Sequence, residues 1–306
     1  MVERTPLLDA VTHLFLVLGI ALTCLPIYLA FVAASQTVEE VNRLPMSLLP
    51  GMAFGANIAE AWSRADLGLQ LWNSFVQAAG IAIGKIAISL LSAFAIVYFD
   101  FPCRMAFFWL IFVSLMLPVE VRIVPTYEVA ANALYPLVWL GRTLGLEGLI
   151  SALLGWDVSF DVKLSLLNSY AGLIVPLIAS ATATFLFRQV FMTVPNELCE
   201  AAKLDGATPM QFFRYILLPL SRTNIAALGV IMFIFGWNQF LWPLLITTEP
   251  DYTTIVIGIA RLMPGPDTLP EWNVVMAAAL IAMLPPILVV VLLQRLFVKG
   301  LVETDK

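Results

Sequence analysis

The sequence has few charged residues and few of the side chains from which most enzyme sites are built. Asp, Glu, Lys and Arg make up 12% of the 306 residues, whereas 61% of the residues are hydrophobic. The single histidine is His13, and the three cysteines, Cys24, Cys103 and Cys199, lie far apart. This composition excludes a disordered chain, a disulfide framework and histidine-based metal or triad chemistry. It indicates a polytopic membrane protein.

The sequence also lacks a nucleotide-binding motif, and its net charge of −5 argues against a nucleic-acid partner. The stretch from Gly80 to Ile86 resembles a phosphate-binding loop. However, only three residues separate Gly80 from Gly84, and Ile86 stands where the motif needs Ser or Thr. Gly80 and Gly84 instead predict a small-residue face that lets this helix approach a neighbour closely. Any ATP that drives this protein must therefore bind to a separate subunit.

Long apolar runs dominate the rest of the chain. A membrane-spanning helix needs about 20 mostly apolar residues. Six runs meet this length: Val11–Ala34, Leu71–Val97, Met105–Val129, Tyr170–Phe191, Asn224–Ile246 and Val274–Phe297. We therefore predict an all-α fold with six transmembrane helices over residues 11–298. A short N-terminal segment (1–10) and a charged tail (299–306) flank this membrane domain.

The basic residues predict the orientation of these spans. With the N-terminus inside, nine Lys and Arg residues fall in inner segments: Arg4, Arg104, Arg188, Lys203, Arg214, Arg222, Arg295, Lys299 and Lys306. Six fall in the longer outer segments: Arg43, Arg64, Arg122, Arg142, Lys163 and Arg261. Because basic residues concentrate on the cytoplasmic side, both termini are predicted to be cytoplasmic.

Two outer segments follow from this orientation before the fourth span. Ser35–Gln70 is polar and rich in Pro and Gly, which predicts an external loop. The second outer segment, residues 133–168, contains the apolar stretch Leu144–Leu154, which is too short to cross a membrane. With Trp139 and Trp156 on either side, this stretch predicts an interfacial or re-entrant helix.

A polar stretch of residues 192–221, which we call the knuckle, separates the fourth and fifth runs. Pro195 suits the first turn of a short helix, and Gly206 can adopt the positive φ that ends it. Thr208 and Gln211 have the spacing of a capping box, with Pro209 at the first position of a second helix. The knuckle is thus predicted to be a helix–turn–helix with an apolar back.

The knuckle carries a family resemblance. Glu200-Ala201-Ala202, followed by Asp205-Gly206-Ala207 and by Ile216-x-Leu218-Pro219, resembles the EAA signature of permease subunits of bacterial ATP-binding-cassette importers. The resemblance implies that these residues form a coupling helix that docks into a groove on a cytoplasmic ATPase subunit. An ordinary surface hairpin of a membrane protein is the alternative interpretation.

The resemblance extends over nearly the whole chain to permeases of the sugar-importer type, and among these to those of sn-glycerol-3-phosphate importers. The residues that carry it are Leu115–Arg122, Ser180–Gln189, Gly236–Gln239, Glu271–Asn273 and Gln294–Arg295. The segment 133–168 is longer than the link expected in such permeases.

This resemblance implies a non-enzymatic subunit of the bacterial inner membrane. It would work with a sister permease, a periplasmic binding protein and two ATPase subunits that bind the ATP and Mg. The expected solute is sn-glycerol-3-phosphate or a related glycerophosphodiester. One alternative keeps this machinery and imports a neutral sugar or oligosaccharide. Another is an ion-coupled carrier or channel acting alone, which the coupling signature and the absence of repeated halves with broken helices disfavour.

Polar residues within the spans are candidates for the solute pathway or a gate. Lys85 lies in the middle of the second run and would either pair with Glu120 or line the path of an anion. Arg122 has the same two interpretations, beside the helix-breaking Pro118. Asn238 and Gln239 would hydrogen-bond between helices or contact a solute, and packing is the favoured role, as it is for Trp237, Trp272 and Asn273.

Overall fold

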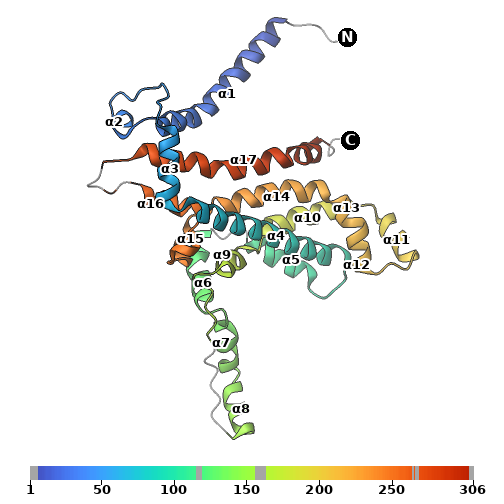
Figure 1. The fold of residues 1–306 in the computed structure, drawn as a ribbon. Helices are drawn as coiled ribbons and strands as arrows, with labels where there is room; N and C mark the ends of the chain where they lie inside the picture. Colours follow the sequence, from blue (N-terminus) through green and yellow to red (C-terminus); the bar gives the residue numbers. More distant parts are fainter. Residues whose placement is uncertain (1–5, 115–118, 156–162, 264, 266–268, 303–306) are drawn as a thin grey trace. The chain divides into compact units, whose positions relative to one another are not determined.

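The computed structural model describes residues 6–114, 119–155, 163–263, 265 and 269–302 (Figure 1). These residues form helices joined by loops and turns and contain no strand, which confirms the predicted all-α class. The chain divides into two units, Met1–Leu71 with Ile255–Pro285 and Trp72–Thr254 with Pro286–Lys306.

Three of the predicted spans are single long helices. They are α1 (Pro6–Ser35), α4 (Leu67–Tyr98) and α17 (Trp272–Val302), and each is long and apolar enough to cross a membrane. All three extend a few residues beyond the predicted apolar runs. Polar residues such as Asp9 and Gln70 lie within these helices but outside the predicted apolar runs, so hydropathy alone underestimates the ends.

The fourth predicted span is bent rather than continuous. It consists of α9 (Tyr170–Ile174), η2 (Val175–Leu177) and α10 (Ala181–Met192), and its two parts meet at 52°. Pro176 has no N–H to donate to the carbonyl of Gly172, and that carbonyl instead accepts a hydrogen bond from Trp242 Nε1 at 3.0 Å. The Ser180 side chain then accepts from the Ala183 N–H and starts α10.

The fifth predicted span is also interrupted. α14 (Arg222–Trp237) ends before Asn238, and α15 (Leu241–Ile246) begins after Phe240. Pro243 cannot donate to the carbonyl of Gln239, so the helix does not continue through this point. The apolar runs predicted both spans but did not predict these breaks.

The third predicted run contains α5 (Arg104–Val113) and α6 (Val119–Ala131), while residues 115–118 lie outside the described part. The described residues thus contain three long spans, and five if each of two bent helix pairs counts as one. One of these pairs joins the helix Pro209–Leu220 to α14 at 74°. The count of six spans stays a prediction.

Two of the segments between the spans contain short helices. The segment after α1 holds α2 (Val38–Val41) and α3 (Phe54–Ala65), and the segment after α15 holds η4 (Pro250–Tyr252) and α16 (Ile255–Leu262). Buried Asn57 on α3 donates to the carbonyls of Ala34 and Gln36 at 2.8 and 2.9 Å. Asn273 of α17 donates to Asn57 Oδ1 at 2.8 Å, which supports a packing role for Asn273.

In the second unit, α4 lies very close to the bent fourth span. A Cβ atom added at Gly80 would lie 2.5 Å from Ile174 Cδ1, and one added at Gly84 would lie 2.5 Å from Ile178 Cγ2. Real Cβ atoms do not approach other atoms so closely, so a side chain at either position would force Ile174 or Ile178 to move. The predicted packing role of Gly80 and Gly84 is confirmed.

Residues 133–168 include two helices that extend away from α6 as an arm (Figure 1). They are α7 (Tyr135–Thr143), which was not predicted, and α8 (Leu146–Leu154), which confirms a helix within Leu144–Leu154. Two backbone hydrogen bonds close the base of the arm, from Ala133 to Leu164 and from Leu166 to Ala130. The bulky apolar side chains on the arm are largely exposed, including Trp139 at 56% and Leu153 at 77%.

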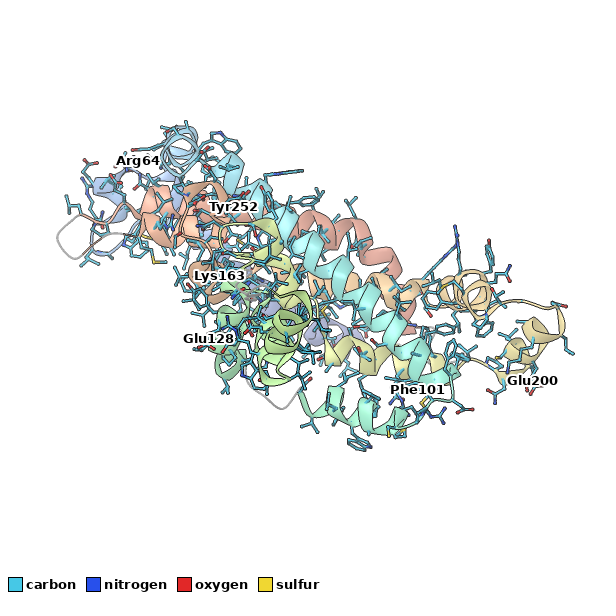
Figure 2. All side chains as sticks on the ribbon, turned by 90° about the horizontal axis from the view of Figure 1, so that it is seen from below. Arg64, Phe101, Glu128, Lys163, Glu200 and Tyr252 are labelled. Carbon is cyan, nitrogen blue, oxygen red and sulfur yellow. The ribbon has the colours of Figure 1, made fainter. Side chains whose placement is uncertain are left out.

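The second unit has two distinct ends. Figure 2 places Phe101 and Glu200 toward one end, and Glu128, Lys163 and Tyr252 toward the other. Segments predicted to be inner and outer are therefore separated along this unit.

The predicted topology can be tested by cysteine labelling. Single cysteines replace exposed Leu44, Leu153 and Leu269, or Asp100 and Leu204, in a chain whose three native cysteines are changed to Ser. We expect a membrane-impermeant maleimide to label the first three positions from outside and the last two only in opened vesicles. Labelling of position 153 from the inside would contradict the predicted topology.

A second prediction concerns the close approach at Gly84. Gly84→Ala should destabilise the protein by about 1–3 kcal/mol, because the β-branched Ile178 cannot move away easily. The matched control is Gly229→Ala on α14, where the added Cβ would meet Ile86 Cδ1 at an ordinary 3.6 Å. Thermal unfolding of the purified proteins measures both, and equal melting temperatures for the two variants would refute the packing requirement.

Candidate functional site

The first helix of the knuckle ends in a complete capping motif. α11 (Asn196–Leu204) follows Pro195, which stands just before the helix rather than in its first turn as predicted. At its end, Gly206 adopts a φ of 73°. The Gly206 N–H donates to Lys203 and the Ala207 N–H donates to Ala202, which is the Schellman arrangement. The predicted role of Gly206 in ending the helix is confirmed.

The second helix of the knuckle begins with the predicted capping box. The Gln211 N–H donates to Thr208 Oγ1, and the Thr208 N–H donates to Gln211 Oε1 at 2.7 Å. The helix continues as α12 (Pro209–Phe212), a π-helical segment η3 (Phe213–Leu217) and α13 (Leu218–Leu220). Local hydrogen bonds thus cap both helix ends at this turn.

The exposed face of the knuckle differs from the face expected from sequence. Glu200, Ala201, Asp205 and Gly206 are exposed, but Ala202 is buried and faces the interior. Ala202 and Ala207 line a cavity of about 80 Å³ between the knuckle and the end of α4, so the docking role of these two residues stays a prediction. Sequence reasoning also missed Leu204, whose side chain is 89% exposed. Its position just before Asp205-Gly206, at the end of a polar helix, was the available signal.

Aromatic contacts connect the knuckle to the end of α4. The rings of Tyr98 and Phe212 lie 5.2 Å apart, and those of Phe94 and Phe213 lie 4.9 Å apart. The Tyr98 hydroxyl also donates to the Phe191 carbonyl at 3.2 Å. Offset and edge-to-face aromatic pairs contribute about 0.5–1.5 kcal/mol each beyond their buried area. The knuckle is therefore packed rigidly against α4.

The breaks in the fourth and fifth spans border a cavity of about 130 Å³. Its walls come from α4, α6, α14, α15 and both broken segments, and the lining residues include Lys85, Arg122, Thr126, Leu177, Ala179, Phe235, Gln239 and Trp242. A cavity of this size can hold several water molecules or a small polar group. Lys85, Arg122 and Gln239, proposed from sequence as pathway residues, thus come together in one cavity.

Lys85 is the most buried charge in this cavity, with 7% of its surface exposed. Its Nζ lies 3.6 Å from the centroid of the Phe235 ring. A lysine at membrane depth costs about 2.5–3.5 kcal/mol. A desolvated cation–π contact returns about 2 kcal/mol, so Phe235 offsets part of that cost.

Other predicted residues lie apart from this cavity or outside the described part. Asn238 is exposed at the end of α14 and does not line the cavity. Trp237 is buried and stacks on Phe233, with centroids 5.9 Å apart, as a packing residue does. The side chain of Glu120 lies outside the described residues, so its pairing with Lys85 stays a prediction. Among the described side chains, neither Lys85 nor Arg122 forms an ion pair.

The sequence is similar to known transport proteins. A family model described as "Binding-protein-dependent transport system inner membrane component" matches residues 80–303. The chain is 52% identical to the sn-glycerol-3-phosphate transport system permease protein UgpE of Agrobacterium fabrum (strain C58 / ATCC 33970), over 100% of both chains. It is 49% identical to the protein of that name from Escherichia coli O1:K1 / APEC, again over 100% of both chains.

Two solved structures share the fold. One is a bacterial ABC transporter involved in the import of the acidic polysaccharide alginate, with a TM-score of 0.74, 15% identity, and coverage of 96% of this chain and 98% of that chain. The other is a bacterial alginate ABC transporter in complex with an alginate pentasaccharide-bound periplasmic protein. It has a TM-score of 0.58 and 16% identity, and covers 95% of this chain and 96% of that chain.

Proposed function

Because the chain belongs to the family of binding-protein-dependent transport system inner membrane components, we propose that it forms half of the pathway of an sn-glycerol-3-phosphate importer. Relatives of about half-identical sequence, matched over their whole length, are named as permease proteins of that transport system. Its role as a transport subunit rather than an enzyme follows from the family. Glycerophosphodiesters are the related solutes that the same pathway would accept.

The observation that carries this proposal is the knuckle. It is a short polar helix–turn–helix at one end of the second unit, and it presents Glu200, Ala201 and Leu204 away from its own chain. A protruding leucine flanked by charged residues suits a groove with an apolar floor and a basic rim. We therefore assign the knuckle to docking on a cytoplasmic ATPase subunit.

The remaining partners follow from this assignment. A sister permease supplies the other half of the pathway, two ATPase subunits bind the ATP and Mg, and a periplasmic binding protein delivers the solute. The permease resides in the inner membrane, with both termini on the cytoplasmic side with the knuckle. This chain holds no cofactor of its own in this scheme.

Variants of the knuckle test the coupling. Glu200→Arg reverses the exposed charge, Leu204→Asp removes the exposed apolar contact, and Gly206→Val forces a β-branched residue into a positive φ. Each should leave the permease inserted and paired with its sister. ATP hydrolysis stimulated by the binding protein, and solute uptake into proteoliposomes, should each fall by about tenfold or more, the effect of losing an interfacial hot spot.

The control for these variants is Lys203→Gln, because Lys203 lies on the same short helix but lines the cavity that this helix forms with the end of α4. It should retain stimulated hydrolysis. Normal turnover in a reconstituted Glu200→Arg, Gly206→Val double variant would show that the knuckle does not couple the subunits. Purification of the wild-type chain without a co-eluting ATPase would contradict the proposed machinery itself.

A deletion of the arm tests whether the arm contacts the binding protein on the predicted outer side. Replacing residues 135–162 with a short Gly/Ser link keeps the hydrogen bonds at the base of the arm. The permease should then assemble with its ATPase, while its affinity for the binding protein falls, because the exposed arm is no longer available for contact. Extending the deletion through Asn168 should instead destabilise the fold, because Asn168 Oδ1 accepts the N–H groups of Thr248 and Glu249. Lost assembly in the shorter deletion would refute this role of the arm.

A further inference from the structure

The cavity between α4 and the two broken spans has the features of an anion site. Lys85 is 7% exposed and lines this cavity, and Arg122 lines it from α6. Two like charges in one cavity repel each other in a low-dielectric surrounding. Among the described side chains, no carboxylate pairs with either cation. An anion bound between them would relieve this repulsion.

The other lining groups suit a small, partly polar anion. Gln239 and Thr126 offer polar side chains. Gln239 also donates to the Phe235 carbonyl of α14, and Thr126 donates to the Arg122 carbonyl of α6. Phe235 and Trp242 supply apolar walls, and Trp242 is fixed by its hydrogen bond to Gly172. Irregular backbone at membrane depth is tolerated where it borders a cavity, and both span breaks border this one.

We propose that Lys85 and Arg122 bind the phosphate group of the transported solute as it passes through this half of the pathway. The inference rests on the proposed function and adds the chemical group that is recognised and the residues that recognise it. Lys85 supplies a buried point charge, and Arg122, on the exposed side, supplies a planar fork that matches phosphate oxygens. The Lys85 ammonium lies over the Phe235 ring, which holds it within the cavity.

The test uses the complete importer in proteoliposomes, with radiolabelled sn-glycerol-3-phosphate as the probe. Lys85→Met and Arg122→Gln should each lower uptake about tenfold, the loss expected for one charge-assisted hydrogen bond. Lys85→Arg keeps the charge and should retain more uptake than Lys85→Met. ATP hydrolysis stimulated by the loaded binding protein should persist, so each variant should use more ATP per solute imported.

Arg43→Gln is the matched control, because it removes one exposed positive charge outside the cavity and should leave uptake unchanged. Arg122→Glu covers the case in which Lys85→Met fails to assemble, because Arg122 is exposed and its replacement leaves no buried gap. Arg122→Glu should abolish uptake. Unchanged uptake by assembled Arg122→Glu importer would overturn the proposal, and this is also the result expected if the cavity held the phosphate of a lipid headgroup.

Lys85→Met combined with Glu120→Gln separates solute binding from a structural ion pair. Restoration of normal uptake in this double variant would show that Lys85 only neutralises Glu120 and would overturn the proposal. Continued loss of uptake with intact stimulated hydrolysis supports it. Absence of sn-glycerol-3-phosphate uptake by the wild-type importer would instead contradict the proposed function, so the two failures are distinguishable.

Discussion

The close approach of α4 to the bent fourth span is the contact on which the second unit depends. Gly80 and Gly84 leave space for Ile174 and Ile178, and a methyl group at either position would force the facing isoleucine to move. Lys85 follows Gly84 directly in α4. The close approach of Gly84 to Ile178 therefore also places the Lys85 side chain beside the break in the fourth span. Close packing and the position of the charge are thus one structural feature.

The break itself is stabilised from a different part of the chain. Pro176 frees the Gly172 carbonyl, and an unsatisfied carbonyl at membrane depth is costly. Trp242 compensates by donating its indole N–H, and it lies on α15, beyond the break in the fifth span. Two irregular segments therefore support each other, and the same tryptophan forms a wall of the cavity.

α4 also links the cavity to the knuckle. Lys85 and Tyr98 are thirteen residues apart on one uninterrupted helix, which corresponds to about 20 Å along its axis. At the Tyr98 end, aromatic contacts join α4 to both Phe191 and Phe212, on the two sides of α11. A displacement of the knuckle would therefore act on the end of α4 through these ring contacts.

Much of this arrangement could be predicted from sequence because it rests on local rules. Hydropathy located α1, α4 and α17, and the capping residues Gly206 and Thr208 set the turn of the knuckle. The breaks in the fourth and fifth spans were missed because Pro176 and Pro243 occur inside apolar runs, where hydropathy does not register a missing N–H. The burial of Ala202 was missed because the side of α11 that faces Phe212 is set by tertiary packing. Tertiary packing also brings Lys85 and Gln239 into one cavity.

In the described structure Lys85 contacts the aromatic ring of Phe235, and this kind of contact affects how an anion would bind and leave. A carboxylate would hold the ammonium strongly, and an incoming phosphate would have to displace it at a large cost in a low-dielectric cavity. The Phe235 ring offers a weaker contact that can persist while the ammonium also binds an anion. A pathway site must bind its solute firmly enough to admit it and weakly enough to release it. A cation held by an aromatic ring, with a second cation on the exposed side, meets both requirements.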